Sequence, residues 1–240
     1  MRNNQVPIVV VALFVSSLLS LASCSGTKAP ADATPQAVAP QAAAPVTRVV
    51  RPASVVFVEG KVTVNGASVE PGDEIGRKFN VRTEPGARLD LVFDDRNVLS
   101  IGQNAFVDID LTSLVPDVKL ERGGVTAVLK KLEVVATGNS FNVQTAQTVM
   151  GVRGTSFCIW ADATSTYVCA CNGEIHTIDA KGNNEETLTA AHHVARVFSP
   201  KDGGISVEAA GMLHHTDASV ESVASRISYT IDWTKVDHLE

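Results

Sequence analysis

The stretch VRGTSFCIWADATSTYVCACNGEIH, residues 152–176, contains three of the four cysteines of the chain. Two runs rich in β-branched and aromatic residues flank a polar centre, which predicts two antiparallel strands joined by a two-residue turn. In this register Trp160 pairs with Tyr167, and Cys158 faces Cys169. The aromatic pair favours this register, because a slip of one residue would turn Cys158 to the opposite face.

A strand with a glycine in its middle recurs at three places in the chain. The segments are VVFVEGKVTVNG around Gly60, VKLERGGVTAVL around Gly123 and YVCACNGEIHTI around Gly173. Each pattern predicts a strand, a kink or bulge at the glycine, and a continuing strand. Short β-favouring segments lie between them, and no long helical periodicity precedes residue 215. We therefore predict an all-β fold of many short strands, in a rolled sandwich or a short solenoid-like domain, with one C-terminal helix.

Aligning the three glycines predicts the direction of two sulfurs. Cys169 and Cys171 then take the positions of Val56 and Val58, which we expect to face inward. Because residues i and i+2 of a strand share a face, both sulfurs point the same way. We expect them to lie in the core or in a pocket at its rim.

The composition limits the classes of function. Hydrophobic residues make up 45% of the 240 residues and aromatic residues 5%, so the core must be mainly aliphatic. A net charge of −6 without a basic stripe argues against a nucleic-acid partner. The sequence lacks the G-x-S-x-G, H-E-x-x-H and phosphate-loop motifs, and it does not identify a small-molecule ligand. We expect a protein that is not an enzyme, with a metal-dependent or redox enzyme as the alternative.

The N-terminal residues 1–23 have the pattern of a secretory signal: one arginine, then a long uncharged apolar run. The motif LASC at residues 21–24 resembles a bacterial lipobox, which implies cleavage before Cys24 and acylation of that residue with chains such as palmitate. Ser25 resembles the pattern of proteins sent to the outer membrane. We expect a lipid anchor at the periplasmic face of the bacterial cell envelope, with the membrane and an envelope protein as partners. A plain cleaved signal or an uncleaved anchor is the alternative.

The rest of the chain divides into three parts. Residues 24–52 include a run rich in Ala and Pro, which predicts a semi-extended tether. Residues 53–200 form the predicted β domain. Residues 201–240 form a C-terminal segment in which Thr216 caps a helix with an apolar stripe of Val220, Val223 and Ile227.

The order of these segments resembles a FecR domain. VEGKVTV, VEPGDEI and NVRTEPGARLDLVFDDRNVLSIGQNAFVDID resemble its first part; VKLERGGVTAVL, FNVQTAQTVMGVRGTSF and YVCACNGEI resemble its second. The tetrapeptide VRGT at 152–155, followed by Phe157, resembles the most recognisable family motif. The likeness extends from Ser54 to Phe198. It implies an all-β extracytoplasmic module, often a binding or scaffold part, without catalysis.

The family takes its name from inner-membrane regulators that pass a signal from an outer-membrane siderophore receptor to a cytoplasmic sigma factor. Those proteins have a cytoplasmic N-terminal segment and a true membrane span. Here only residues 1–5 precede the apolar run, so we do not carry the sigma-regulator function over to this chain.

A subset of FecR domains resembles this chain more closely through three elements: CACNG at 169–173, His192-His193 and the HTD motif at 215–217. Thiolates and imidazoles form a soft donor set, which selects zinc, iron or copper over calcium or magnesium. We therefore predict a metal site that holds zinc or iron. Its predicted ligands are Cys169, Cys171, His193 and His215, with Cys158, His192 and His214 as further candidates and Asp217 orienting a ligating imidazole.

Two other interpretations of the cysteines stay open. An exported protein meets oxidising conditions, so Cys158 could form a disulfide with Cys169 or Cys171 in a signalling module without metal. Alternatively, the three cysteines could simply fill the core in place of valine.

Overall fold

The computed structural model describes residues 52–113, 115–130 and 141–237. The predicted signal peptide, the predicted lipidation site Cys24 and the predicted tether at 24–52, apart from Pro52, lie outside these residues. Within the described ranges, no helix has the length and apolar character needed to cross a membrane.

Most of the described residues form strands, which confirms the predicted all-β class. The strands of the first half are β1 (Ala53–Glu59), β2 (Val62–Val64), β3 (Ala67–Ser68), β4 (Glu74–Ile75), β5 (Lys78–Thr83), β6 (Arg88–Phe93), β7 (Asn97–Ile101) and β8 (Phe106–Asp110). Then follow β9 (Asp117–Leu129), β10 (Phe141–Gln144), β11 (Thr148–Val152), β12 (Thr155–Ala161), β13 (Thr166–Asp179), β14 (Glu186–Ala190), β15 (Val194–Lys201) and β16 (Gly204–Ala210). Helix α1 (Asp217–Ala224) and the short 3₁₀ turn η1 (Ser225–Ile227) follow the last strand.

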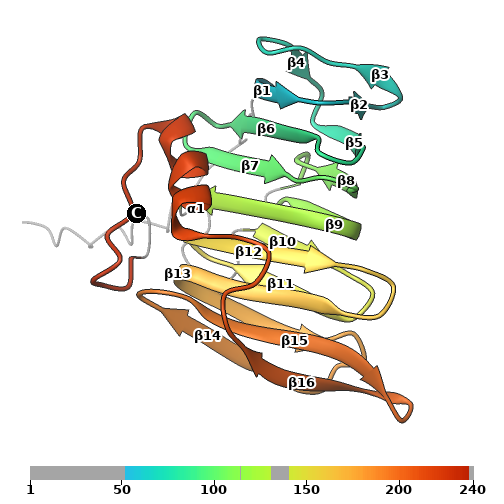
Figure 1. Cartoon of the computed structure of the whole chain (residues 1–240), viewed down its shortest axis with the longest axis vertical. Helices are drawn as coiled ribbons and strands as arrows, with labels where there is room; N and C mark the ends of the chain where they lie inside the picture. The colour runs from blue at the N-terminus through green and yellow to red at the C-terminus, as the bar shows by residue number, and fades with distance from the viewer. Residues whose placement is uncertain (1–51, 114, 131–140, 238–240) are drawn as a thin grey trace, which may run out of the picture. The chain divides into compact units, whose positions relative to one another are not determined.

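The strands form two sheets, and the two long strands β9 and β13 belong to both. Sheet A has the order β4-β1-β6-β7-β9-β12-β13-β15-β16 (Figure 1). Sheet B has the order β3-β2-β5-β8-β9-β10-β11-β13-β14. The β9–β10 pair is parallel, and the other pairs of the described strands are antiparallel.

The long strands pass from one sheet to the other at the predicted glycines. In β9, residues up to Arg122 pair in sheet B, and residues from Gly123 pair in sheet A. Gly123 has a φ of +86°, and a Cβ at this position would lie 2.5 Å from Cα of Ala105. We call the place where a strand passes from one sheet to the other a corner. At the Gly123 corner, any side chain would therefore collide with the Ala105 backbone. β13 changes sheets in the same way at Gly173, with a φ of +115°.

The sandwich interior lies between the two sheets and is mainly aliphatic, with five phenylalanines among its residues. Leu91 of β6, Ala127 of β9 and Phe157 of β12 from sheet A are buried in one cluster with Val81 of β5 and Met150 of β11 from sheet B. Burying one such large side chain contributes about 1.5–3 kcal/mol. The period-two alternation in the sequence thus produces a rolled sandwich.

The C-terminal segment covers the outer face of sheet A. Helix α1 packs on β9 and β7 (Figure 1). Thr216 caps it, since the Thr216 hydroxyl accepts a hydrogen bond from the Ser219 N–H, and Val220 and Val223 are buried, as predicted. We call the buried cluster between sheet A and this segment the outer layer; it comprises Val98, Val128, Cys158, Tyr167, Cys169, Cys171, Ala195, Val220, Val223, Ala224 and Ile231.

A buried ion pair joins the C-terminal segment to sheet A. The Arg226 Nε atom of η1 donates to Asp90 Oδ2 of β6 at 3.0 Å. Arg88 also donates to both oxygens of this carboxylate at 2.8 Å, and the Asp90 side chain is fully buried. A buried charge needs such partners, so the ion pair fixes where η1 packs.

The hairpin of residues 155–171 has the predicted register. Cys158 lies opposite Cys169, and Trp160 lies opposite Tyr167. The Asp162 N–H donates to the Ser165 carbonyl at 3.0 Å, which closes the turn. The cross-strand aromatic pair was therefore a sound guide to the register.

Both sulfurs are buried in a hydrophobic cluster, as predicted, but they do not face the sandwich interior as the valine positions suggested. Val168 and Ala170 point into the sandwich interior, whereas Cys169 and Cys171 lie in the outer layer on the other face of sheet A. The glycine alignment failed because the bulges differ: β1 has its irregularity between Val55 and Phe57, and β13 has one next to Cys171. A bulge reverses the alternation of side chains beyond it.

Candidate metal centre

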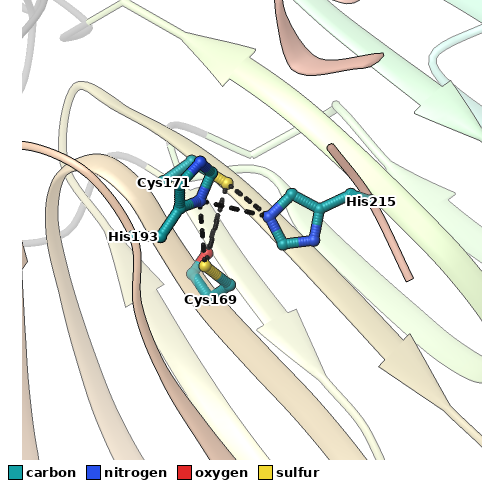
Figure 2. A group of neighbouring side chains, drawn as sticks. All are labelled: Cys169, Cys171, His193 and His215. Carbon is teal, nitrogen blue, oxygen red and sulfur yellow. Dashed lines mark hydrogen bonds between the residues drawn. The ribbon is translucent and has the colours of Figure 1, made fainter. Parts of the chain in front are cut away.

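Four side chains from three parts of the chain meet in the outer layer. Cys169 and Cys171 come from β13, His193 from the turn between β14 and β15, and His215 from the loop between β16 and α1 (Figure 2). One donor atom from each of the four lies within 4.8 Å of the other three. The structure therefore brings together the quartet of ligands that the sequence predicted.

Backbone contacts hold the two histidines in place. His193 has a φ of +49°, and its N–H donates to the Cys171 carbonyl at 3.0 Å. The loop before His215 is held by the Tyr167 hydroxyl, which donates to the Gly211 carbonyl and accepts from the Leu213 N–H, both at 3.1 Å. Hydrogen bonds of the His193 backbone and of the loop before His215 thus hold both residues near the sulfurs, in addition to the hydrogen bonds of the rings themselves.

The outer partner of each imidazole decides which ring nitrogen carries hydrogen. His193 Nε2 lies 2.8 Å from Asp217 Oδ1, and His215 Nδ1 lies 2.6 Å from the Leu213 carbonyl oxygen. A carboxylate and a carbonyl only accept, so these two nitrogens donate. In the neutral rings, His193 Nδ1 and His215 Nε2 therefore present lone pairs toward the sulfurs. A carboxylate or carbonyl behind the ring is the usual support of a metal-ligating histidine.

Four of the six distances among the donor atoms are close to the edges of a metal tetrahedron, and the other two are within 4.8 Å. Bond lengths of about 2.3 Å to sulfur and about 2.0–2.1 Å to nitrogen give edges of about 3.8 Å (S–S), about 3.5 Å (S–N) and about 3.3 Å (N–N). Sγ of Cys169 and Sγ of Cys171 are 4.0 Å apart, and His193 Nδ1 and His215 Nε2 are 3.2 Å apart. The Cys169–His193 and Cys171–His215 distances are both 3.5 Å. These residues could hold one tetrahedral cation.

Without a metal, the four groups share protons unevenly. A hydrogen bond from Cys171, together with the histidine rings, lowers the pKa of Cys169 to about 3 despite its burial. Burial and the neighbouring Cys169 sulfur raise the pKa of Cys171 well above the ordinary thiol value. Burial lowers the pKa of His215, but hydrogen bonds to Cys158 and Cys169 outweigh it and raise that pKa to about 10. Without a metal, the favoured state therefore places the protonated imidazole of His215 beside the thiolate of Cys169.

The end of the chain covers the cluster through contacts that sequence reasoning missed. The Trp233 ring lies 5.1 Å from the His193 ring and donates from Nε1 to Glu221 at 2.8 Å. The buried Asn172 amide donates to the carbonyls of Asp232 and Lys235, at 3.1 and 2.9 Å. One signal was present in the sequence: Trp233 is one of only two tryptophans in the chain.

The other candidate ligands lie around the quartet. His192 is half exposed, and its Nε2 lies 3.0 Å from Asp217 Oδ2, so the same carboxylate serves both neighbouring histidines. His214 stacks on Trp160 at 4.8 Å with an interplanar angle of 7°. Cys158 is buried in the outer layer beside the quartet, but it is not one of the four mutually close donors. Asp217 occupies the predicted orienting position.

The three described cysteines are free thiols in this structure. The disulfide of Cys158 with Cys169 or Cys171 is not formed within the described part of the chain, and it stays an alternative.

Comparison with known proteins finds a family model that matches part of the chain. The model of the family described as FecR protein matches residues 79–176, from β5 into β13. The chain contains a FecR domain. The match to the FecR family includes Cys169 and Cys171 but ends before His193 and His215. The predicted likeness from Ser54 to Phe198 is longer than this match, and both histidines of the quartet come from the chain beyond it.

Two solved structures also resemble the chain, and both are of candidate anti-sigma factors from Parabacteroides distasonis. One has 17% identity and a TM-score of 0.45, and the match covers 54% of this chain and 59% of the other. The second has 15% identity and a TM-score of 0.46, covering 64% of this chain and 80% of the other. The chain thus spans less than two thirds of the first neighbour's length. The comparison with curated proteins gives no match.

Proposed function

We propose that this protein is an envelope-anchored, non-catalytic binding or scaffold lipoprotein, whose FecR domain and C-terminal segment share a closed four-ligand metal centre. The observation that carries the metal centre is the convergence of two imidazole nitrogens, 3.2 Å apart, with two sulfurs that are 4.0 Å apart. When a metal displaces the shared protons, all four atoms present lone pairs to the same point, as a soft cation requires.

Zinc fits the donor set best. Two sulfurs and two nitrogens in a tetrahedral arrangement indicate zinc or iron, and hard cations such as calcium prefer oxygen. Zinc has no preferred d-electron geometry and accepts a tetrahedron without strain. Iron is the second choice for the same four ligands.

The arrangement supports a structural or sensory role rather than catalysis. Four protein donors fill a tetrahedron and leave no position for water or substrate, as in structural zinc sites. The ion would join β13 to the turn before β15 and to the loop before α1. Metal occupancy would then control how firmly the C-terminal segment is held on sheet A.

Metal content tests the proposal directly. Full-length protein purified without a tag should contain zinc in an equimolar amount, measured by plasma mass spectrometry. Cys169→Ser and His215→Ala should each lose most of it and melt at a lower temperature. His176→Ala is the matched control, because His176 is also on β13 but contacts Glu185 and Thr187 instead. Unchanged metal content and melting temperature in both ligand variants would contradict the proposal.

Cobalt substitution separates the closed centre from the enzyme alternative. Cobalt in place of zinc should give the strong visible absorption of a tetrahedral site with two thiolates. Added azide should leave this spectrum unchanged if the four protein ligands fill the site. A shift of the spectrum by azide would reveal an open position and favour the metal-dependent or redox enzyme.

The lipid anchor is tested separately. The LASC motif at 21–24 supports acylation of Cys24. The protein should fractionate with membranes and incorporate labelled palmitate, and Cys24→Ala should abolish the labelling. Release of unlabelled wild-type protein into the soluble periplasmic fraction would support a plain cleaved signal instead.

A further inference from the structure

Cys158 is a third thiol beside the metal centre without a role in the proposed tetrahedron. It lies directly opposite Cys169 in the β12–β13 pair, and only 2% of its surface is exposed. Both residues belong to the outer layer, so their side chains lie on the same face of sheet A. A thiol in this place can react with a metal ligand.

Strand geometry selects Cys169 as its partner. Directly opposite residues in antiparallel strands have Cα atoms about 4.5–5.5 Å apart, within the span of about 4.4–6.8 Å that a disulfide bridges. The register shifts beside Cys171, because Ser156 pairs with Asn172 while Phe157 pairs with Ala170. Diagonal neighbours are about 7–8 Å apart, beyond the reach of a disulfide without backbone movement.

A small cavity gives an oxidant access to Cys158. It has a volume of about 160 Å³, and its lining includes Cys158, Trp160, His214 and His215. This is several times the roughly 30 Å³ that one water occupies in the liquid. A hydroperoxide therefore fits next to the Cys158 sulfur.

We propose that Cys158 makes the metal centre redox-sensitive: a hydroperoxide converts Cys158 and Cys169 to a disulfide and thereby expels the metal. This inference rests on the proposed metal centre. The site would then have two states: a metal-bound form in which Cys158 is a free thiol, and a metal-free form in which Cys158 and Cys169 form a disulfide.

The reaction balances with hydrogen peroxide as the oxidant. The Cys158 thiol attacks one peroxide oxygen and breaks the O–O bond, giving a sulfenic acid and one water. Cys169 Sγ then leaves the metal and attacks Cys158 Sγ, and the displaced hydroxide takes up one proton and leaves as a second water. Two sulfurs lose two electrons in total, the peroxide gains them, and the metal departs as a dication.

Peroxide treatment of zinc-loaded full-length protein in detergent tests this inference. Zinc release is followed with a chromogenic chelator, and the disulfide is mapped by mass spectrometry after Asp-N digestion. Cleavage before Asp162 separates Cys158 from the peptide that holds both Cys169 and Cys171, so a disulfide from Cys158 holds the two peptides together. Fragmentation of the linked peptide between Cys169 and Cys171 then shows which of the two is bonded, and a bond to Cys171 would overturn the assignment of Cys169. We expect zinc release and the disulfide of Cys158 with Cys169 to appear together.

Two variants of Cys158 separate its chemistry from its packing. Cys158→Ser and Cys158→Ala should bind zinc like the wild type but release it at least about tenfold more slowly under peroxide. Ser156→Ala, a buried change on the same strand, is the matched control and should release zinc at the wild-type rate.

The outcomes distinguish the two proposals. If wild-type protein binds no zinc, the metal centre itself fails. If it binds zinc and both Cys158 variants release it at the wild-type rate, or if the disulfide joins Cys169 to Cys171, only the redox inference is overturned.

Discussion

The sandwich interior and the outer layer lie on opposite faces of sheet A and differ in their chemistry. Among the described residues, the interior cluster consists of Ala, Val, Leu, Ile, Met and Phe. The outer layer contains all three described cysteines, and the histidines and Trp233 border it. The interior is stabilised by burial of apolar area alone, whereas the outer layer also depends on a few directed contacts.

This difference indicates that the proposed metal centre and its function belong to the outer layer, whereas the interior determines the stability of the sandwich. Changes in the interior should affect the whole sandwich regardless of metal. Changes in the outer layer should depend on metal and remain local to the C-terminal segment. Four predictions test this division, in order of decreasing effect.

Truncation in the interior should have the largest effect. Phe157 is fully buried, so Phe157→Ala should lower the free energy of unfolding by about 3–5 kcal/mol through lost burial and a cavity. Urea unfolding followed by far-UV circular dichroism measures this. Met212→Ala is the control, since Met212 is 43% exposed, and it should change stability by less than about 0.5 kcal/mol. A loss from Phe157→Ala that changed greatly on adding a chelator would contradict the division.

Metal removal should have the next largest effect, limited to the outer layer. At free zinc a hundredfold above its dissociation constant, bound zinc stabilises the fold by about 2.7 kcal/mol, which a chelator removes. Hydrogen–deuterium exchange should then rise in residues 211–237 but not in β5 and β8 of sheet B. An equal rise in both regions would show that the metal supports the whole sandwich.

The corner at Gly123 should show a smaller loss that does not depend on metal. Gly123→Ala adds a left-handed backbone cost and a collision with Ala105, together at least about 2 kcal/mol. Gly182 has a similar φ of +79°, but a Cβ added there would meet no described atom within 4 Å. Gly182→Ala should therefore cost only about 1 kcal/mol. Equal losses in thermal unfolding would show that the close approach at the corner is unimportant.

The smallest effect should come from an ion pair on sheet B. Hydrogen bonds from Thr112 and Lys78 lower the pKa of Asp110 from 3.8 to about 2. Because the folded-state pKa is depressed, this stabilisation is present above about pH 4 and is lost as the pH falls toward 2. Asp110→Asn should cost less than about 1 kcal/mol at pH 7, since the pair is screened by solvent. Its urea midpoint should converge with the wild type near pH 2, with or without zinc; a constant difference would contradict this account.

Much of the fold could be predicted from residues that lie close together in the sequence. The glycine corners, the register of Cys158 with Cys169 and the cap at Thr216 all follow from residues close in sequence. The quartet could also be predicted, because soft donors are few in this chain and gather after residue 157.

The face of sheet A on which the quartet lies, and the segment that covers it, could not be predicted from the same patterns. An outward strand face is normally polar, and here it is apolar because a segment some 60 residues further along covers it, as the contact between Asn172 and Asp232 shows. The direction of the sulfurs depended on a one-residue bulge, which alternation does not reveal. The cover by Trp233 is likewise a tertiary contact without a local signal.

The spacing of the four ligands has a consequence for folding kinetics. His193 lies 24 residues beyond Cys169, and His215 lies 44 residues beyond Cys171, so the donors meet only after long loops have closed. Because an ion binds firmly only when all four donors are in place, we expect it to bind after the rate-limiting step of folding. A bound ion would then leave the refolding rate almost unchanged and slow unfolding instead, giving the protein a long lifetime once loaded.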